Sequence, residues 1–175
     1  MKFTELKLKG AYIIELEPHV DDRGTFSRQF CKREFQKNGI NFEICQCNIS
    51  KNYKKGTIRG LHYHKEPYLE QKIISCLRGK FFDVIVDLRK DSPTYLKWQS
   101  VELHEDDNKL LYIPEKFAHG FQTLKDNTVI YYQLSNYFMP DCYAGLRWDD
   151  PKLGICWPEN KNIIINDRDK NYGLL

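Results

Sequence analysis

One segment of the chain reads Phe81-Phe82-Asp83-Val84-Ile85-Val86-Asp87-Leu88. Phe82, Val84 and Val86 alternate with a more mixed set of residues, which predicts a strand with one strongly apolar face and one mixed face. Other short apolar or alternating segments lie on both sides of it, separated by turn residues, at 11–16, 72–77, 109–113, 128–134 and 162–165. Many short strands at this spacing predict a β-sandwich or barrel.

The clearest helix signal is short and covers residues 32–37, with Gly39 placed where a glycine commonly ends a helix. The chain has 175 residues, which suits one domain with a substantial core. It contains no internal repeat and no linker-like segment. We therefore expect one all-β domain spanning residues 1–175, with a few short helices.

The composition excludes several classes of protein. Lys and Arg total 27 against 24 Asp and Glu, and a net charge of +3 is too small for the concentrated basic stripe of a nucleic-acid-binding protein. No run of 18 apolar residues and no signal-peptide core occurs, so we expect a cytoplasmic protein that does not enter a membrane. Six scattered cysteines without a Cys-x-x-Cys pair predict reduced thiols.

The chemistry is densest in Gly56-Thr57-Ile58-Arg59-Gly60-Leu61-His62-Tyr63-His64 and in Pro114-Glu115-Lys116-Phe117-Ala118-His119-Gly120-Phe121. His62 and His64 are two positions apart, so a strand would point both imidazoles to one face. The two segments resemble the two cupin motifs, which implies a cupin-type β jelly roll. In metal cupins the matching residues bind a divalent metal, and here they are His62, His64, Glu70 and His119. The longer spacing from His64 to Glu70, and Lys116 in place of the motif glycine, favour a site without metal.

A set of longer motifs extends from about Leu8 to Asp169. They include Asp22-Arg23-Gly24-x-Phe26, Gln46-x-Asn48, Arg59-Gly60-Leu61-His62-Tyr63, Ala118-His119-Gly120-Phe121 and Trp148-x-Asp150-Pro151. In order and spacing they resemble the dTDP-4-dehydrorhamnose 3,5-epimerases. The resemblance implies an isomerase without cofactor, which inverts C3 and/or C5 of a nucleotide-diphospho-4-keto-6-deoxy sugar in deoxysugar or surface-glycan biosynthesis. It also implies a homodimer.

The reaction defines the groups that the site must contain. A ketone at C4 acidifies the hydrogens on C3 and C5, so inversion needs a base, a group that stabilises the enolate, and an acid on the opposite face. By resemblance, His62 is the base and Asp169 is its carboxylate partner. Lys72 stabilises the enolate, and Tyr132 returns the proton.

The resemblance also places polar and aromatic side chains around the substrate. These are Arg23, Phe26, Arg28, Gln46, Asn48, Arg59, His119 and Phe138. The planar guanidinium of Arg59 suits the phosphates or the sugar, and that of Arg23 suits the nucleotide end. Phe26 is expected to stack on the base.

Two residues depart from the common family pattern, and each leaves an alternative activity or substrate open. Phe138 stands where a second tyrosine is usual, which admits an enzyme that inverts only one carbon. Arg28 stands where a glutamate is usual, which admits GDP or another nucleotide. Two further alternatives are a metal-dependent cupin enzyme such as an oxygenase, and a non-catalytic carbohydrate-binding cupin. The second would not need the base, the lysine and the tyrosine together.

Overall fold

The computed structural model describes all 175 residues, and its regular structure is mainly β-strand. The strands are β1 (Lys2–Glu5), β2 (Tyr12–Glu15), β3 (His19–Asp21), β4 (Gly24–Phe26), β5 (Gln46–Asn52), β6 (Ile58–His64), β7 (Lys72–Arg78), β8 (Lys80–Asp87), β9 (Trp98–His104), β10 (Lys109–Ile113), β11 (Phe117–Thr123), β12 (Thr128–Leu134) and β13 (Tyr143–Gly145). The helices are α1 (Lys32–Lys37), α2 (Asp167–Lys170) and a short 3-10 helix, η1 (Pro140–Cys142). The expected all-β class is confirmed, and α1, β10 and β12 have the predicted bounds.

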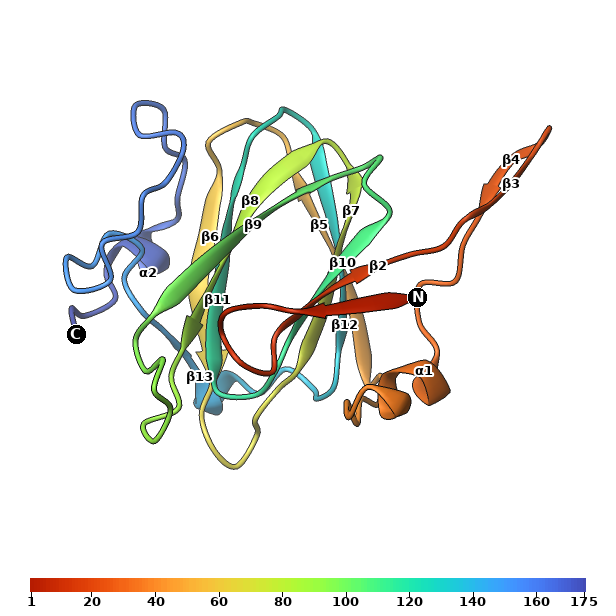
Figure 1. The fold of residues 1–175 in the computed structure, drawn as a ribbon. Helices are drawn as coiled ribbons and strands as arrows, with labels where there is room; N and C mark the ends of the chain where they lie inside the picture. The colour runs from red at the N-terminus through yellow and green to blue at the C-terminus, as the bar shows by residue number, and fades with distance from the viewer.

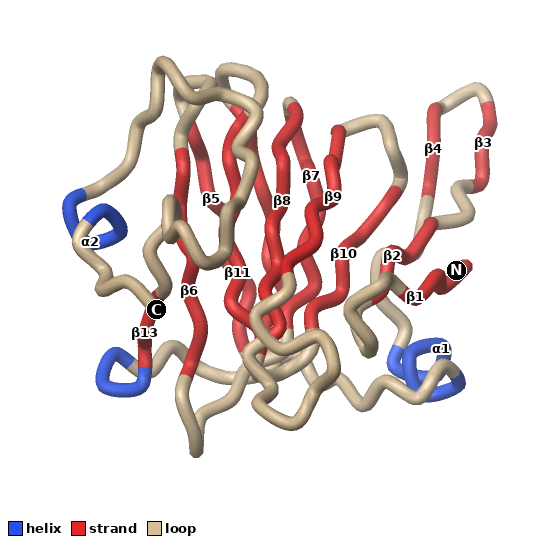
Figure 2. The backbone as a smooth tube through the Cα atoms, turned by 60° about the vertical axis from the view of Figure 1, so that its left-hand side comes forward, coloured by secondary structure: helices blue, strands red, loops and turns tan.

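Two antiparallel sheets face each other (Figure 1, Figure 2). The strand order is β1-β2-β10-β7-β12-β5 in the six-stranded sheet and β13-β6-β11-β8-β9 in the five-stranded sheet. The chain changes sheet at every step from β5 to β8 and again at every step from β9 to β13, as in a jelly roll. The expected cupin-type jelly roll is confirmed.

Strand β8 is buried on both faces. Phe81 and Ile85 belong to the apolar core between the sheets. Val84 and Val86 face the other way and pack with Trp157, from the C-terminal segment that lies outside the five-stranded sheet (Figure 1). The strongly apolar face predicted for this strand is therefore the outer one. The mixed face looks between the sheets.

The prediction of a strand at 162–165 was wrong. Only Ile164 pairs, in an isolated parallel bridge with Thr57 just before β6. The N–H of Ile58 donates to the carbonyl of Ile164 at 2.8 Å, and the N–H of Ile164 donates to the carbonyl of Gly56 at 3.0 Å. Because the pairing does not extend beyond this bridge, no ladder forms. The contact still fixes the C-terminal segment against β6.

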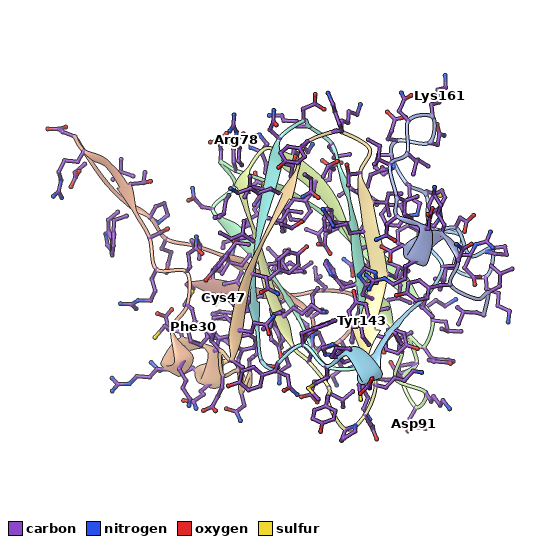
Figure 3. The ribbon with its side chains drawn as sticks, turned by 180° about the vertical axis from the view of Figure 1, so that it is seen from behind. Phe30, Cys47, Arg78, Asp91, Tyr143 and Lys161 are labelled. Carbon is purple, nitrogen blue, oxygen red and sulfur yellow. The ribbon has the colours of Figure 1, made fainter.

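Strands β3 and β4 form a hairpin that projects away from both sheets (Figure 1, Figure 3). Val20 and Phe26 are 74% and 76% exposed on it. Its backbone pairs only within the hairpin, as a separate two-stranded sheet. Two large apolar side chains therefore stand in the open at a distance from the core.

No helix of the chain is long and apolar enough to cross a membrane. All six cysteines are free thiols, as the sequence predicts.

A β-bulge in β6 determines which side chains face the interior. His119 of β11 pairs with His62, but Phe121 pairs with Arg59, so two residues of β6 oppose the single Gly120. Without the extra residue, Arg59 and His62 would point to opposite faces, because side chains alternate along a strand. With it, both side chains line the space between the sheets.

The bulge requires glycine at position 60, and replacing it is expected to destabilise the fold. Gly60 has φ 122°, and an added Cβ would lie 2.5 Å from Gly120 Cα and 2.8 Å from the carbonyl oxygen of His119. Backbone strain and overpacking together are expected to make Gly60→Ala less stable by about 2–4 kcal/mol in urea unfolding. Gly24→Ala is the matched control, because Gly24 has the same φ of 122° with nothing within 4 Å. Equal losses for the two variants would contradict the packing argument.

Candidate active site

A cavity of about 300 Å³ opens between the two sheets. Its lining includes all four residues predicted to be catalytic: His62, Lys72, Tyr132 and Asp169. His62 comes from β6 in the five-stranded sheet, whereas Lys72 and Tyr132 come from β7 and β12 in the six-stranded sheet. The base and the proton donor expected from the sequence therefore extend from opposite walls.

His62 and Asp169 form a hydrogen-bonded pair. Nε2 of His62 lies 2.8 Å from Oδ1 of Asp169, and a carboxylate can only accept, so Nε2 carries the proton. The other carboxylate oxygen accepts the backbone N–H of Gly60 at 3.0 Å. The backbone N–H of Asp169 in turn donates to Oδ1 of Asn166, which caps α2, at 2.7 Å. These bonds hold the carboxylate against β6 and leave Nδ1 of His62 as the nitrogen free to accept a proton.

The surroundings keep this pair ready for proton abstraction. Burial lowers the pKa of His62 below its ordinary value of 6.5, and the hydrogen bond to Asp169 partly offsets that effect. For Asp169, burial acts to raise the pKa, but the hydrogen bonds from His62 and Gly60 prevail and lower it. At neutral pH the imidazole is therefore neutral beside an ionised carboxylate, which is the state that a general base needs.

The opposite wall supplies a cation and a protonated phenol. The ammonium group of Lys72 pairs with Glu70 and is largely buried. Burial raises the pKa of Tyr132 well above its ordinary value, so its hydroxyl keeps its proton and can donate it. The Tyr132 ring meets His119 edge to face, with 6.1 Å between centroids.

Five of the eight residues predicted to bind substrate also line the cavity: Gln46, Asn48, Arg59, His119 and Phe138. Nε of Arg59 donates to Oδ1 of Asn52 at 2.9 Å. Nε2 of His119 lies 2.7 Å from Oδ2 of the fully buried Asp83. The side-chain amide of Gln46 donates to Oδ1 of Asn48 at 3.1 Å, and its oxygen accepts the backbone N–H of Phe138 at 3.2 Å.

The other three lie outside the cavity of this chain. Arg23, in the turn of the β3–β4 hairpin, pairs with Asp21, and Phe26 ends the same hairpin. Arg28 follows the hairpin, and its Nη1 pairs with Glu34 of α1 at 2.8 Å. The sequence motif that contains Arg23 and Phe26 is thus carried by a projecting hairpin instead of the cavity wall.

The cavity-lining residues that sequence reasoning missed include Tyr143, Asn166 and Arg168. The ring of Tyr143 lies 5.0 Å from that of His62, at the end of β6 where β13 joins the sheet (Figure 3). The guanidinium of Arg168 lies 5.0 Å above the Tyr143 ring. An Asn three residues before an Asp is a helix-start signal, and it could have indicated that Asp169 lies in an ordered turn.

The residues of the metal-cupin alternative do not converge on one point. His62 is bonded to Asp169, His119 to Asp83, and Glu70 to Lys72. The structure contains no group of three or more His, Cys, Asp or Glu side chains placed to hold a metal ion. Three of the four expected donors are therefore engaged by other side chains.

Comparison with known proteins gives a consistent result. The family described as dTDP-4-dehydrorhamnose 3,5-epimerase matches residues 5–175. A dTDP-4-dehydrorhamnose 3,5-epimerase from Sinorhizobium fredii (strain NBRC 101917 / NGR234) is 40% identical over 175 residues, which cover 100% of this chain and 90% of the relative.

Solved structures agree with the sequence comparison. A dTDP-4-dehydrorhamnose 3,5-epimerase from Bacillus anthracis str. Ames, with TDP and PPi bound, matches with a TM-score of 0.95 at 38% identity and covers 99% of both chains. A 3'-monoepimerase from Streptomyces bikiniensis, in complex with dTDP-quinovose, matches with a TM-score of 0.91 at 31% identity. That match covers 97% of this chain and 86% of the monoepimerase.

Proposed function

Because this chain belongs to the dTDP-4-dehydrorhamnose 3,5-epimerase family, we propose that it inverts C3 and C5 of a nucleotide-linked 4-keto-6-deoxy sugar by way of an enolate. The observation that carries the proposal is the placement of His62 on one wall of the cavity and of Lys72 and Tyr132 on the other. Inversion requires proton removal on one face of a carbon and proton delivery on the other. Two facing sheets supply those positions.

Each inversion is a pair of proton transfers. Nδ1 of His62 removes the hydrogen on the carbon next to the ketone, and the electron pair moves into an enolate whose charge lies mainly on the C4 oxygen. The ammonium of Lys72 stabilises that charge in a buried site, where such an interaction is stronger than in water. The Tyr132 hydroxyl then protonates the carbon from the other face. Solvent restores the proton to the phenolate, and the imidazolium releases its proton.

The cavity also has the charge expected for an anionic substrate. Its cations are Arg59, Lys72 and Arg168, and its carboxylates are Glu70 and Asp169, each of which is paired with a cation or with His62. Arg59 is proposed to bind the diphosphate through its planar guanidinium. The TDP bound to the Bacillus anthracis relative supports dTDP as the nucleotide.

We propose a homodimer in which the β3–β4 hairpin serves the partner subunit. The hairpin carries Arg23 and the exposed Phe26 away from its own cavity, which supports a role in contact with another copy. The edge strand β1 pairs only with β2 in this chain, so its other edge is open to a partner's sheet. The single-domain organisation and the cytoplasmic location stay predictions from the sequence.

The test of this function is deuterium incorporation from heavy water. The purified protein is incubated separately with dTDP-linked and with GDP-linked 4-keto-6-deoxyglucose. We expect it to exchange the hydrogens on C3 and C5 of the dTDP-linked sugar faster than those of the GDP-linked sugar. NMR and mass analysis of the sugar report the site and the extent of exchange. Absence of exchange at both carbons, with either nucleotide, would overturn the proposal.

The pH dependence should follow the His62–Asp169 pair. The base must be neutral, and burial lowers the pKa of His62, so the acid limb of kcat/KM is expected to have its midpoint below the ordinary histidine pKa of 6.5. Asp169 raises that pKa. Asp169→Asn is therefore expected to move the acid limb to still lower pH while the plateau falls. A limb that moves to higher pH would contradict the assignment.

A narrower activity, inversion at one carbon, is favoured by Phe138. This residue lines the cavity without a hydroxyl, so Tyr132 is the tyrosine assigned to proton return at both carbons. We expect deuterium exchange at C3 and C5 at markedly unequal rates. Phe138→Tyr is expected to narrow the gap, since it adds only a hydroxyl to a half-exposed ring. Equal rates at the two carbons in the unaltered protein would show that Phe138 has no such role.

A further inference from the structure

His64 is a buried polar side chain that the proposed mechanism leaves without a function. It lines the same cavity as His62, and its side chain is 2% exposed. Neither Nδ1 nor Nε2 has a hydrogen-bond partner within the chain. Buried polar groups in native proteins nearly always have partners, so an orphaned imidazole on the wall of a cavity indicates that a ligand supplies one.

Glu70 stands between His64 and Lys72. One of its carboxylate oxygens pairs with the ammonium of Lys72, and the other lies 3.7 Å from Nδ1 of His64. A proton on Nδ1 is attracted to this carboxylate, which leaves Nε2 as an acceptor. Burial lowers the pKa of His64 below its ordinary value, so the imidazole stays neutral and keeps that acceptor.

The other neighbours of His64 are aromatic rings. Its ring centroid lies 6.1 Å from that of Phe138 and 5.6 Å from that of Tyr143. Phe138 and Tyr143 are themselves 5.2 Å apart and meet edge to face. These rings confine the imidazole and offer its Nε2 no hydrogen-bond donor in the structure.

A neutral acceptor selects the chemistry of its ligand. It binds a hydroxyl hydrogen, and it does not bind a phosphate oxygen, a ketone oxygen or a methyl group. Glu70 lies between His64 and Lys72, so these two side chains line adjacent parts of the cavity and are placed to bind adjacent substituents of one sugar ring. The proposed target of Lys72 is the C4 oxygen. Of the two carbons beside C4, C3 carries a hydroxyl and C5 carries a methyl group.

We propose that His64, oriented by Glu70, binds the C3 hydroxyl of the sugar and is a specificity-determining residue for inversion at C3. This inference rests on the proposed function and deepens it. The hydrogen bond fixes the position of C3 in the cavity and so aligns the C3 hydrogen with His62. Inversion at C5 does not use the contact.

The test compares two variants on two substrates. His64→Phe keeps a planar ring and removes the acceptor, whereas His64→Gln keeps an amide acceptor. With the hydroxylated 4-keto sugar in heavy water, His64→Phe is expected to slow exchange at C3 by roughly 10- to 100-fold and to leave exchange at C5 within about threefold. His64→Gln is expected to recover most of the C3 rate. With the 3-deoxy analogue, the unaltered enzyme and His64→Phe should exchange at equal rates at C3.

Controls separate this inference from the function on which it rests. His104→Phe, at the end of β9 and outside the cavity, should change neither rate. Equal slowing at C3 and C5, or a C3 loss that persists with the 3-deoxy analogue, would overturn the role of His64 while the epimerase function stands. No exchange by the unaltered enzyme at either carbon would overturn the function and the inference together.

A measurement without any variant covers the case in which His64→Phe does not fold. In protein labelled with ¹⁵N-histidine, the hydroxylated sugar nucleotide should shift the Nε2 resonance of His64 in the direction of an accepted hydrogen bond. The 3-deoxy analogue should not. Identical shifts with the two ligands would overturn the inference.

Discussion

His62→Ala is expected to lower turnover by about 10²–10⁴-fold and to abolish exchange of solvent deuterium at both carbons, because a positioned base contributes about that factor. Nε2 of His62 lies 2.8 Å from Oδ1 of Asp169. No other imidazole of the cavity is bonded to this carboxylate. Sugar analysis by NMR in heavy water measures the exchange. Circular dichroism should show an unchanged fold.

His104→Ala is the matched control for this variant, since it removes an imidazole that lies outside the cavity. Its turnover should equal that of the unaltered protein. Normal deuterium exchange by His62→Ala would show that another group is the base.

Lys72→Met is expected to lower kcat by about 10²–10³-fold, because a fixed cation beside the developing enolate is lost from a buried site. Lys80→Met is the matched control. Lys80 is also on a strand and also pairs with a glutamate, Glu102, but it does not line the cavity.

Exhaustive chelation should leave the activity of the unaltered enzyme intact. Activity that vanishes with chelator and returns with a divalent ion would favour the metal-cupin alternative.

The sequence predicted the parts of the fold in which local pattern and tertiary structure agree. Strands β10 and β12 have clear apolar patterns, and α1 ends just before Gly39, so their bounds could be predicted. The segment 162–165 is equally apolar but pairs through only one bridge, with Thr57 just before β6. The apolar pattern shows which side chains can be buried, whereas pairing depends on whether a distant segment offers backbone partners along its length.

The candidate site divides in a similar way. Residues carried on interior strands, such as Lys72 and Tyr132, were predicted from the family resemblance and do line the cavity. The pattern of alternation would have placed Arg59 and His62 on opposite faces, because a bulge leaves no simple periodic signal. Phe26 belongs to an equally clear motif, but its hairpin turns away from the cavity. A sequence motif identifies a residue that binds substrate, but it does not show whether that residue lines the cavity of its own chain or of another copy.

The attachment of Asp169 to β6 has a consequence for the timing of activity during synthesis. All the strands of both sheets lie between residues 2 and 145, and a ribosome delivers them before the helix that bears Asp169. A nascent chain can thus assemble a barrel and its cavity while His62 still lacks the carboxylate that orients it. Proteolytic cleavage in the exposed stretch at 160–162, followed by loss of the C-terminal fragment that carries Asp169, would produce the same incomplete state in a finished molecule. In both cases the sugar could be bound without being converted.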